Sequence, residues 1–347
     1  MSRNKELIRF PFLEPPVPGK IEQVDKNIFW ARMPLPFVID HVNVYILEDV
    51  DGLTLVDTGL NVNVCKENWI SIFESFFDSK PIKRIIITHH HPDHVGLLGW
   101  LIKRNDCEVL VSRTSWLLAR MLYLDKQETP SYQAIDFLRK AGMSAKSLNE
   151  TVQSKPFNFS DVVHEIPLGF RALQPREQIF AGGQHWRVEF GNGHAPDHVT
   201  LWGVDKSTLI AGDQVLPGIS SNLGVYPTEP SLNTVGLWME TCKLFKAMAN
   251  SDFLVLPGHN LPFYGLVARL DQLIENHVGA LKRIEAVLKK KSCTAVELFE
   301  PIFKRQIKSS EYSLALAESV GHINYLRALG KLKYSERQDG AILYSLK

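Results

Sequence analysis

The chain has 347 residues, of which 45% are hydrophobic and 22% are charged, so it can bury a large core and form one large domain with a smaller one. Because 39 basic residues balance 38 acidic residues, the formal charge of +1 excludes a global field that recruits nucleic acid or an anionic membrane. Residues 1–20 are polar and then rich in proline, and no apolar run reaches the roughly 18 residues of a membrane span. We therefore expect a cytoplasmic enzyme or binding protein with no membrane partner.

The first half of the chain alternates between strand and helix patterns. Residues 42–60 form two apolar runs around an Asp-Gly turn, which predicts a β-hairpin. Residues 69–77 have helical spacing, residues 82–88 are a β-branched run, and residues 96–104 return to helical spacing. This alternation predicts an α/β fold built of layers.

The second half of the chain changes character twice. Residues from about 113 to 176 consist of amphipathic helical pieces and a stretch rich in Pro and Phe, and we interpret them as an insert. Short strand patterns then resume and end at residue 259, and the chain beyond residue 261 predicts long charged helices followed by a terminal hairpin. The four cysteines are widely spaced without a CxxC pair, which indicates reduced thiols: Cys65, Cys107, Cys242 and Cys293.

Potential metal ligands follow four of the predicted strands. Loops beyond the carboxyl ends of strands converge at one edge of an α/β sheet, so residues that are remote in sequence can meet there. Imidazole and carboxylate suit borderline cations such as zinc, and seven such ligands are too many for one tetrahedral ion. We therefore predict two divalent ions, one held by His89, His91 and His194, the other by Asp93, His94 and His259, with Asp213 as a bridge between them.

These residues carry a family resemblance. The series His89-x-His91-x-Asp93-His94, then His194, Asp213 and His259, resembles the metal-binding motifs of the metallo-β-lactamase-fold hydrolases in their usual order. The resemblance implies a four-layer αββα fold with a helical insert and a dinuclear site, usually of zinc but sometimes of iron or manganese. The segment 55–59 resembles the first motif of the family, whose aspartate, here Asp57, braces the site. Main-subclass β-lactamases have a cysteine where Asp213 stands, so penicillin hydrolysis is not expected.

The C-terminal segment resembles a different feature of the same superfamily. From about residue 270 the sequence is similar to the winged-helix extension of a subgroup with LACTB2-like members. The implied organisation is an N-terminal extension over residues 1–20, a catalytic domain over residues 21–268 and a winged-helix-like domain over residues 269–347.

Two residues are candidates for direct roles in the reaction. Asp93, bound through one oxygen, can orient a hydroxide or protonate a leaving group. His198 lies four residues after His194, but Pro196 disfavours a helix between them, so we expect His198 to orient a ligand or contact substrate. His90 falls between ligands, and its ring is expected to face away. The remaining histidines without a partner pattern are interpreted as structural: His164, His185, His277 and His322.

The predicted constellation points to hydrolysis. Two divalent ions can share a hydroxide of lowered pKa and polarise the oxygen that becomes negative, which suits an acyl or a phosphoryl centre. Apolar residues of the insert, among them Trp116, Leu117, Met121 and Leu124, favour a thioester, ester or lactone of a small acyl substrate, as in glyoxalase II; alternatively they only pack the insert.

Two other functions remain open. Basic residues between Lys282 and Lys308 favour a phosphodiesterase or ribonuclease, with RNA as the partner, although lysines also suit a solvated helix end. A nucleic-acid or partner-binding protein with a structural metal site is the remaining alternative. The oligomeric state is left open by the sequence.

Overall fold

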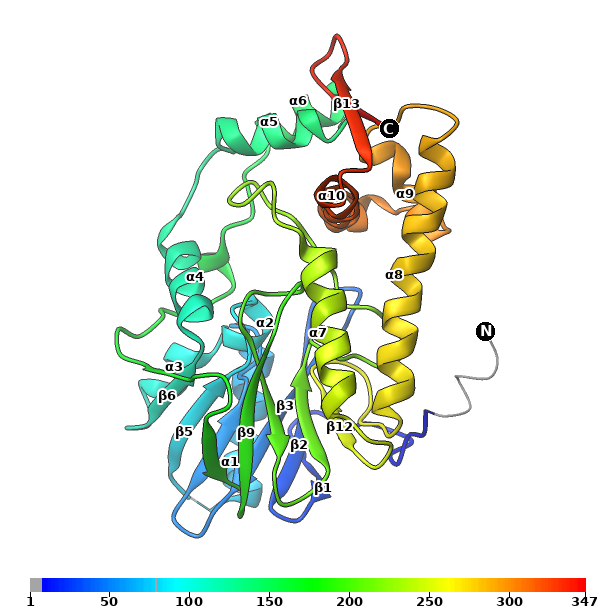
Figure 1. Cartoon of the computed structure of the whole chain (residues 1–347). Helices are drawn as coiled ribbons and strands as arrows, with labels where there is room; N and C mark the ends of the chain where they lie inside the picture. Colours follow the sequence, from blue (N-terminus) through cyan, green and yellow to red (C-terminus); the bar gives the residue numbers. More distant parts are fainter. Residues whose placement is uncertain (1–7, 79) are drawn as a thin grey trace. The chain divides into compact units, whose positions relative to one another are not determined.

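The computed structural model describes residues 8–78 and 80–347 of the chain (Figure 1). The chain divides into two compact units, each assembled from three segments. The first unit consists of Met1–Lys126, Asn158–Ser221 and Met248–Arg269, and the second consists of Gln127–Phe157, Asn222–Ala247 and Leu270–Lys347.

The first unit contains a seven-stranded sheet whose strands follow one another in sequence order. Its strands are β1 (Glu22–Asp25), β2 (Ile28–Pro34), β3 (His41–Glu48), β4 (Leu53–Val56), β5 (Ile82–Ile87), β6 (Glu108–Val111) and β7 (Arg171–Ala172). Neighbours from β1 to β4 pair antiparallel, and neighbours from β4 to β7 pair parallel. The predicted hairpin around the Asp-Gly turn is confirmed as the β3–β4 pair, in which Tyr45 lies opposite Val56.

A second sheet of five strands completes the β-structure of this unit (Figure 1). Its strands are β8 (Gln178–Ala181), β9 (Gln184–Gly191), β10 (His198–Gly203), β11 (Thr208–Gly212) and β12 (Leu254–Pro257), in the order β12-β11-β10-β9-β8. Strands β11 and β12 pair parallel, whereas the other neighbours pair antiparallel. The carboxyl ends of β11 and β12 therefore lie at the same edge of this sheet.

The two faces of β3 show how the layers of the first unit are built. Val44 and Ile46 pack into a hydrophobic cluster with residues of α1 (Asn63–Phe76) and α3 (Leu98–Ile102). Tyr45 and Leu47, which point the other way, pack into a cluster with the second sheet. The unit is thus layered as helices, sheet and sheet, which confirms the predicted α/β class. The fourth layer of the αββα arrangement stays a prediction, because helix α7 (Thr234–Met248) groups almost entirely with the second unit.

The expected insert, residues 113–176, is largely helical but contains strand β7 near its end, and it does not stay in one unit. Helix α4 (Arg113–Leu124) and the short helix η1 (Phe159–Asp161) belong to the first unit, as does the short helix α2 (Pro92–Val95), which lies before the insert. Helices α5 (Tyr132–Lys140) and α6 (Ala145–Gln153) belong to the second. The compact units therefore cut the chain differently from the domain boundaries expected from the sequence, which stay predictions.

The rest of the second unit is helical apart from a terminal hairpin. It contains α8 (Leu266–Leu288), η2 (Val296–Leu298), α9 (Phe299–Phe303), η3 (Ser309–Glu311), α10 (Tyr312–Ala328), β13 (Leu332–Glu336) and β14 (Ile342–Leu346). The predicted long helices and the hairpin are confirmed, and the winged-helix interpretation stays a prediction. Among the described residues, no helix has the length and apolar character needed to span a membrane.

Candidate metal centre

The histidine-rich segment begins where β5, a largely buried parallel strand, ends. His91 keeps an extended backbone, with φ −63° and ψ 149°. Pro92 then opens α2, where its missing N–H costs no hydrogen bond and its fixed φ favours a helix start. His89 and His91 therefore project from an extended loop, whereas Asp93 and His94 project from the helical turn that follows.

Three further candidate ligands follow strands of the second sheet. His194 lies in the loop between β9 and β10, Asp213 directly follows β11, and His259 lies two residues after β12. Gly258, just before His259, has no room for a side chain: a Cβ there would lie 2.1 Å from Oδ1 of Asp213 and 3.0 Å from Cε1 of His94. The backbone after β12 thus packs directly against the carboxylate.

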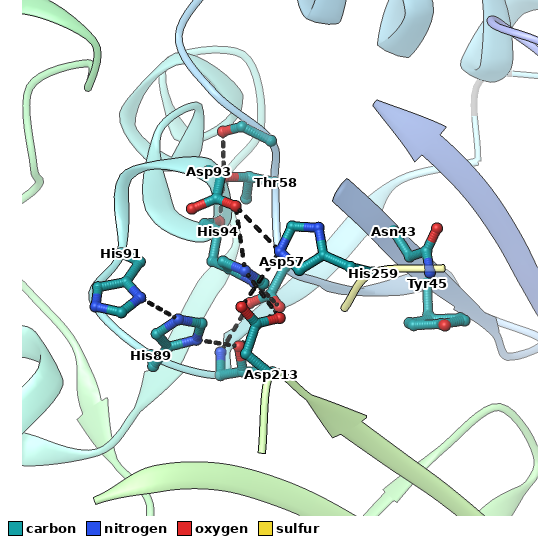
Figure 2. A network of polar contacts seen from close by, with 12 residues as sticks. Asn43, Tyr45, Asp57, Thr58, His89, His91, Asp93, His94, Asp213 and His259 are labelled. Atoms are coloured by element: carbon teal, nitrogen blue, oxygen red, sulfur yellow. Dashed lines mark hydrogen bonds and ion pairs between the residues drawn. The ribbon is translucent and has the colours of Figure 1, made fainter. Parts of the chain in front are cut away.

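Three imidazoles form the first cluster. Nε2 of His89 lies 2.9 Å from Nδ1 of His91 and 3.3 Å from Nε2 of His194. Figure 2 shows His89 and His91 turned toward each other at the side of the site. Nitrogens bound tetrahedrally to one zinc ion at its usual bond length lie about 3.3 Å apart. These spacings suit a shared cation, and the group is the one that the sequence assigns to the first ion.

The second cluster combines a carboxylate with two imidazoles. Oδ2 of Asp93 lies 3.4 Å from Nε2 of His259 and 3.6 Å from Nε2 of His94. The three side chains come from α2 and from the loop after β12, and they face one another in Figure 2. They are the group that the sequence assigns to the second ion.

Asp213 lies between the two clusters. Its Oδ1 is 3.4 Å from Nε2 of His94, and its Oδ2 is 3.2 Å from Nε2 of His259 and 3.5 Å from Nε2 of His194. One carboxylate therefore approaches imidazoles of both clusters, which is the arrangement that a bridging ligand requires.

The donor set fits divalent cations. Nε2 of His94 and Oδ1 of Asp213 are buried and face each other across 3.4 Å without a well-formed hydrogen bond. Buried polar atoms that lack a hydrogen bond are costly, and a cation between them would bind to both. Imidazole nitrogen and carboxylate oxygen are accepted by zinc, iron and manganese. The identity and the number of the ions stay predictions.

A shell of hydrogen bonds orients the candidate ligands. Nδ1 of His94 donates to Oδ2 of Asp57 over 2.8 Å, and Asp57 is held in turn by the backbone N–H and hydroxyl of Thr88 over 2.8 and 2.7 Å. Nδ1 of His259 donates to the backbone carbonyl of His41 over 2.6 Å. Both bonds leave Nε2 as the free lone pair that faces the centre. Asp57 thus occupies the bracing position that the resemblance implies.

Two of these supporting residues were not found from the sequence. His41 also accepts a hydrogen bond at Nε2 from the backbone N–H of Asn260 over 2.8 Å, so it ties the start of β3 to the loop that carries His259. Thr88 is a threonine at a strand end, and His41 is a single histidine at a strand start. Neither position carries a spacing signal that sets it apart in the sequence.

The electrostatics of the two clusters differ. Burial lowers the pKa of His89 and of His91 well below the ordinary value, and neighbouring imidazoles lower it further. Burial also opposes the charged form of His94, but the carboxylates of Asp213 and Asp93 outweigh it and raise the pKa well above the usual range. His89 and His91 of the first cluster therefore offer neutral imidazoles. In the second cluster, a cation has to compete with a proton for the ring nitrogen of His94.

His198 supports the centre from behind. It opens β10 and is fully buried, its Nε2 accepts the backbone N–H of Asp213 over 3.1 Å, and its ring stacks on His89 with centroids 4.5 Å apart. Of the two roles expected from the sequence, these contacts favour the orientation of a ligand over contact with substrate. His90 belongs to none of the potential metal groups found among the described residues.

The proposed apolar stripe on α4 is only partly exposed. Trp116 is buried and stacks on Phe170 with centroids 4.6 Å apart, so it packs this part of the expected insert into the first unit. Leu117, Met121 and Leu124 are 59%, 42% and 66% exposed. An apolar surface for an acyl chain can therefore consist of these three residues but not of Trp116.

The basic segment between Lys282 and Lys308 is partly committed to internal contacts. Arg283 donates to the backbone carbonyls of Pro301 and Ile302, and Arg305 pairs with Glu311. Exposed cations remain at the end of α8 and just after it: Lys289, Lys290 and Lys291.

Comparison with known proteins identifies a family and several similar proteins. The sequence model of the Metallo-beta-lactamase superfamily matches residues 38–259, which include all seven candidate ligands, and that of the Metallo-beta-lactamase-like C-terminal domain matches residues 281–347. The solved structure of a beta-lactamase domain protein from Burkholderia ambifaria is 30% identical, covers 100% of both chains and superposes with a TM-score of 0.92.

Two curated proteins are more distant in sequence. The probable metallo-hydrolase YqjP of Bacillus subtilis (strain 168) is 24% identical over 313 residues, which cover 87% of this chain and 93% of that protein. A beta-lactamase-like protein 2 homolog of Caenorhabditis elegans is 24% identical over 261 residues, which cover 74% of this chain and 68% of that protein. The resemblance stated from the sequence motifs is thereby confirmed.

Proposed function

The chain belongs to the metallo-β-lactamase superfamily, and we propose that it is a hydrolase that uses two divalent ions, first of all zinc, to cleave a thioester, ester or lactone of a small acyl substrate. The observation that carries this proposal is the position of Asp213, whose carboxylate lies 3.2 to 3.5 Å from imidazoles of both clusters. A structural ion needs only one cluster, so a carboxylate shared by two favours a reactive centre.

The chain's own residues prepare this centre for hydrolysis. When bound, the ions would supply an activated water near neutral pH and polarise the carbonyl oxygen of the substrate. Asp57 and the His41 carbonyl fix the proton on Nδ1 of His94 and His259, which keeps Nε2 of both rings turned inward. His198 holds the backbone of Asp213 and the ring of His89 in place. The site is thus organised before substrate arrives.

Asp93 is the candidate proton carrier. Its side chain is 19% exposed, compared with 7% for Asp213, so Asp93 is the carboxylate of the centre that substrate can approach. Its Oδ2 faces His94 and His259, and the second oxygen is available to take a proton from the attacking water and to give it to the leaving group.

The acyl preference is supported by α4. The helix begins at the N-cap Ser112, and the Thr114 hydroxyl donates to the carboxylate of Asp197 in the loop that also carries His194. The exposed stripe of Leu117, Met121 and Leu124 therefore belongs to a helix whose first turn is anchored to a ligand loop. An apolar surface attached in this way suits an acyl chain better than a phosphate.

Cleavage of a phosphodiester, with RNA as the substrate, is the second candidate. It is favoured by the exposed cations Lys289, Lys290 and Lys291, which could contact phosphates. The internal contacts of Arg283 and Arg305 reduce the number of cations available for this role.

The test is a substrate panel with matched variants. Acyl thioesters of two chain lengths, a lactone, a chromogenic phosphodiester and a short RNA are assayed with metal-loaded and with chelated protein. We expect metal-dependent turnover of the acyl substrates, its loss in Asp213→Ala, and no change in the control Asp205→Ala, which removes an exposed carboxylate paired with His185. Turnover restricted to the phosphodiesters would replace the first candidate by the second.

A further inference from the structure

A second group of metal-ligating side chains lies in the second unit, apart from the residues assigned to the hydrolytic centre. His277 is on α8, and Glu318 and His322 are one helical turn apart on α10. One potential ligand atom of each residue lies within 4.8 Å of those of the other two. The two histidines are 3% and 1% exposed, and Glu318 is partly exposed. The sequence interpretation of both histidines as isolated structural residues is therefore incomplete.

The tautomer of His322 is fixed by its surroundings. Its Nδ1 lies 2.9 Å from the backbone carbonyl of Glu318, which can only accept, so Nδ1 carries the proton. The neutral ring then presents the lone pair of Nε2, and this atom lies 3.3 Å from Nδ1 of His277. A histidine whose one nitrogen donates to a backbone carbonyl while the other faces a ligand group has the usual arrangement of a metal-binding histidine.

Hydrogen bonds alone do not satisfy His277. If Nδ1 of His277 carries the proton, it can donate to His322, but the lone pair of Nε2 is then buried with no partner among the described residues. If Nε2 carries the proton, that donor is left unpaired, and two lone pairs face each other across 3.3 Å. A cation between the facing nitrogens removes their repulsion and leaves only the Nε2 proton of His277 without a partner among the described residues. The separation of 3.3 Å is about that of two nitrogens on one tetrahedral zinc ion.

The carboxylate completes the donor set. Oε2 of Glu318 accepts from Nδ2 of Asn222 over 3.0 Å, and the side chain also accepts the backbone N–H of Leu223. Within the described part of the chain, no ion pair involves Glu318, and burial raises the pKa of its carboxyl to about 7, so no basic side chain favours its charged form. Neutral donors that orient a carboxylate beside two imidazoles are typical of the outer hydrogen bonds around a metal site.

We propose that His277, Glu318 and His322 bind one divalent transition-metal ion such as zinc, in addition to the ions of the first unit. Two imidazoles and one carboxylate leave an open coordination position, and the partial exposure of Glu318 provides a path for entry. Such an ion would cross-link α8 to α10 and thereby stabilise the second unit. This proposal does not depend on the proposed hydrolytic function.

The test counts ions in the full chain at a defined free zinc concentration. Glu318→Gln keeps the size of the side chain but removes its charge, and Glu275→Gln makes the same change at an exposed position on α8. We expect the first variant to hold one ion fewer than wild type and the second to hold as many as wild type. The same difference is expected in an Asp213→Ala background, where the first centre is impaired. Equal zinc content in wild type and Glu318→Gln would overturn the proposal.

Anomalous scattering at the zinc edge provides a test that needs no variant. In crystals of the wild-type chain grown with zinc, a peak is expected about 2.0 to 2.2 Å from a ring nitrogen of His277, Nε2 of His322 and a carboxylate oxygen of Glu318. Peaks at the His89 and His259 clusters without one at His322 would show that the second-unit group is a hydrogen-bonded cluster only, and would also overturn the proposal.

Discussion

Replacing Gly258 by alanine tests the geometry of the centre with a single methyl group. The Cβ would lie 2.1 Å from Oδ1 of Asp213, whereas ordinary contacts begin at 3.4 Å, so the carboxylate has to retreat by about 1.3 Å. The backbone of Gly258 does not adopt a positive φ, so alanine introduces no conformational strain of its own. The substitution therefore acts by moving the proposed bridge.

A displacement of about 1 Å in a reacting group costs on the order of 100-fold in rate, or about 2.7 kcal/mol of transition-state stabilisation. We expect Gly258→Ala to lower kcat/KM on the best panel substrate by about this factor and to reduce zinc content below two ions per chain. Atomic emission and steady-state kinetics measure the two effects, and circular dichroism checks that the fold is retained.

The matched control is Gly169→Ala, since a Cβ at Gly169 meets no atom within 4 Å. This variant should keep the metal content and the activity of wild type. Full metal content and undiminished kcat/KM in Gly258→Ala would refute the reasoning, because they would mean that the position of Asp213 does not matter.

Three further variants test other parts of the argument. Asp57→Asn should weaken zinc binding by about 10- to 100-fold, measured by competition with a chelating dye, because the neutral amide has one acceptor oxygen and cannot accept from Thr88 and His94 at all three positions; an unchanged affinity would contradict the bracing role. Met121→Ala should raise KM for long acyl chains about tenfold more than for acetyl, since each lost methylene contact is worth about 0.8 kcal/mol. Equal increases in KM along a chain-length series would show that Met121 does not contact the acyl chain. Glutamine at Lys289, Lys290 and Lys291 should reduce the slope of log K against log salt by roughly 2 to 3 if RNA is the substrate. If the substrate is an ester, the same triple variant should leave turnover unchanged.

The grouping of the candidate ligands could be predicted because the information is local. Each ligand directly follows an apolar strand pattern, and strand ends meet at a sheet edge, so the sequence positions of His89, His194, Asp213 and His259 largely define their neighbourhood.

The contacts of His41 could not be predicted, because they join elements of different sheets. The carbonyl of His41 receives its hydrogen bond from His259, which lies 218 residues further along the chain. Helical spacing likewise identifies the apolar residues of α4 but not which of them are covered. Trp116 is buried against Phe170. Phe170 follows α5 and α6, the helices that group with the second unit, and no pattern in the sequence indicates this contact.

The origin of the ligands also bears on how metal and fold are coupled. The segment from His89 to His94 extends from the first sheet, whereas Asp213 and His259 extend from the second, and the hydrophobic cluster between the sheets holds these two edges together. Without cations, the buried carboxylates of Asp57 and Asp213 and the partly exposed carboxylate of Asp93 pair with imidazoles. Cations bound between the sheets would replace the protons that these imidazoles carry and would cross-link the two sheets. Metal affinity should therefore rise as the pH increases, because protons compete for the same imidazole lone pairs. Metal-free protein should instead lose stability as the pH rises toward the raised pKa values of His94 and His259, because their protonated rings no longer pair with the carboxylates.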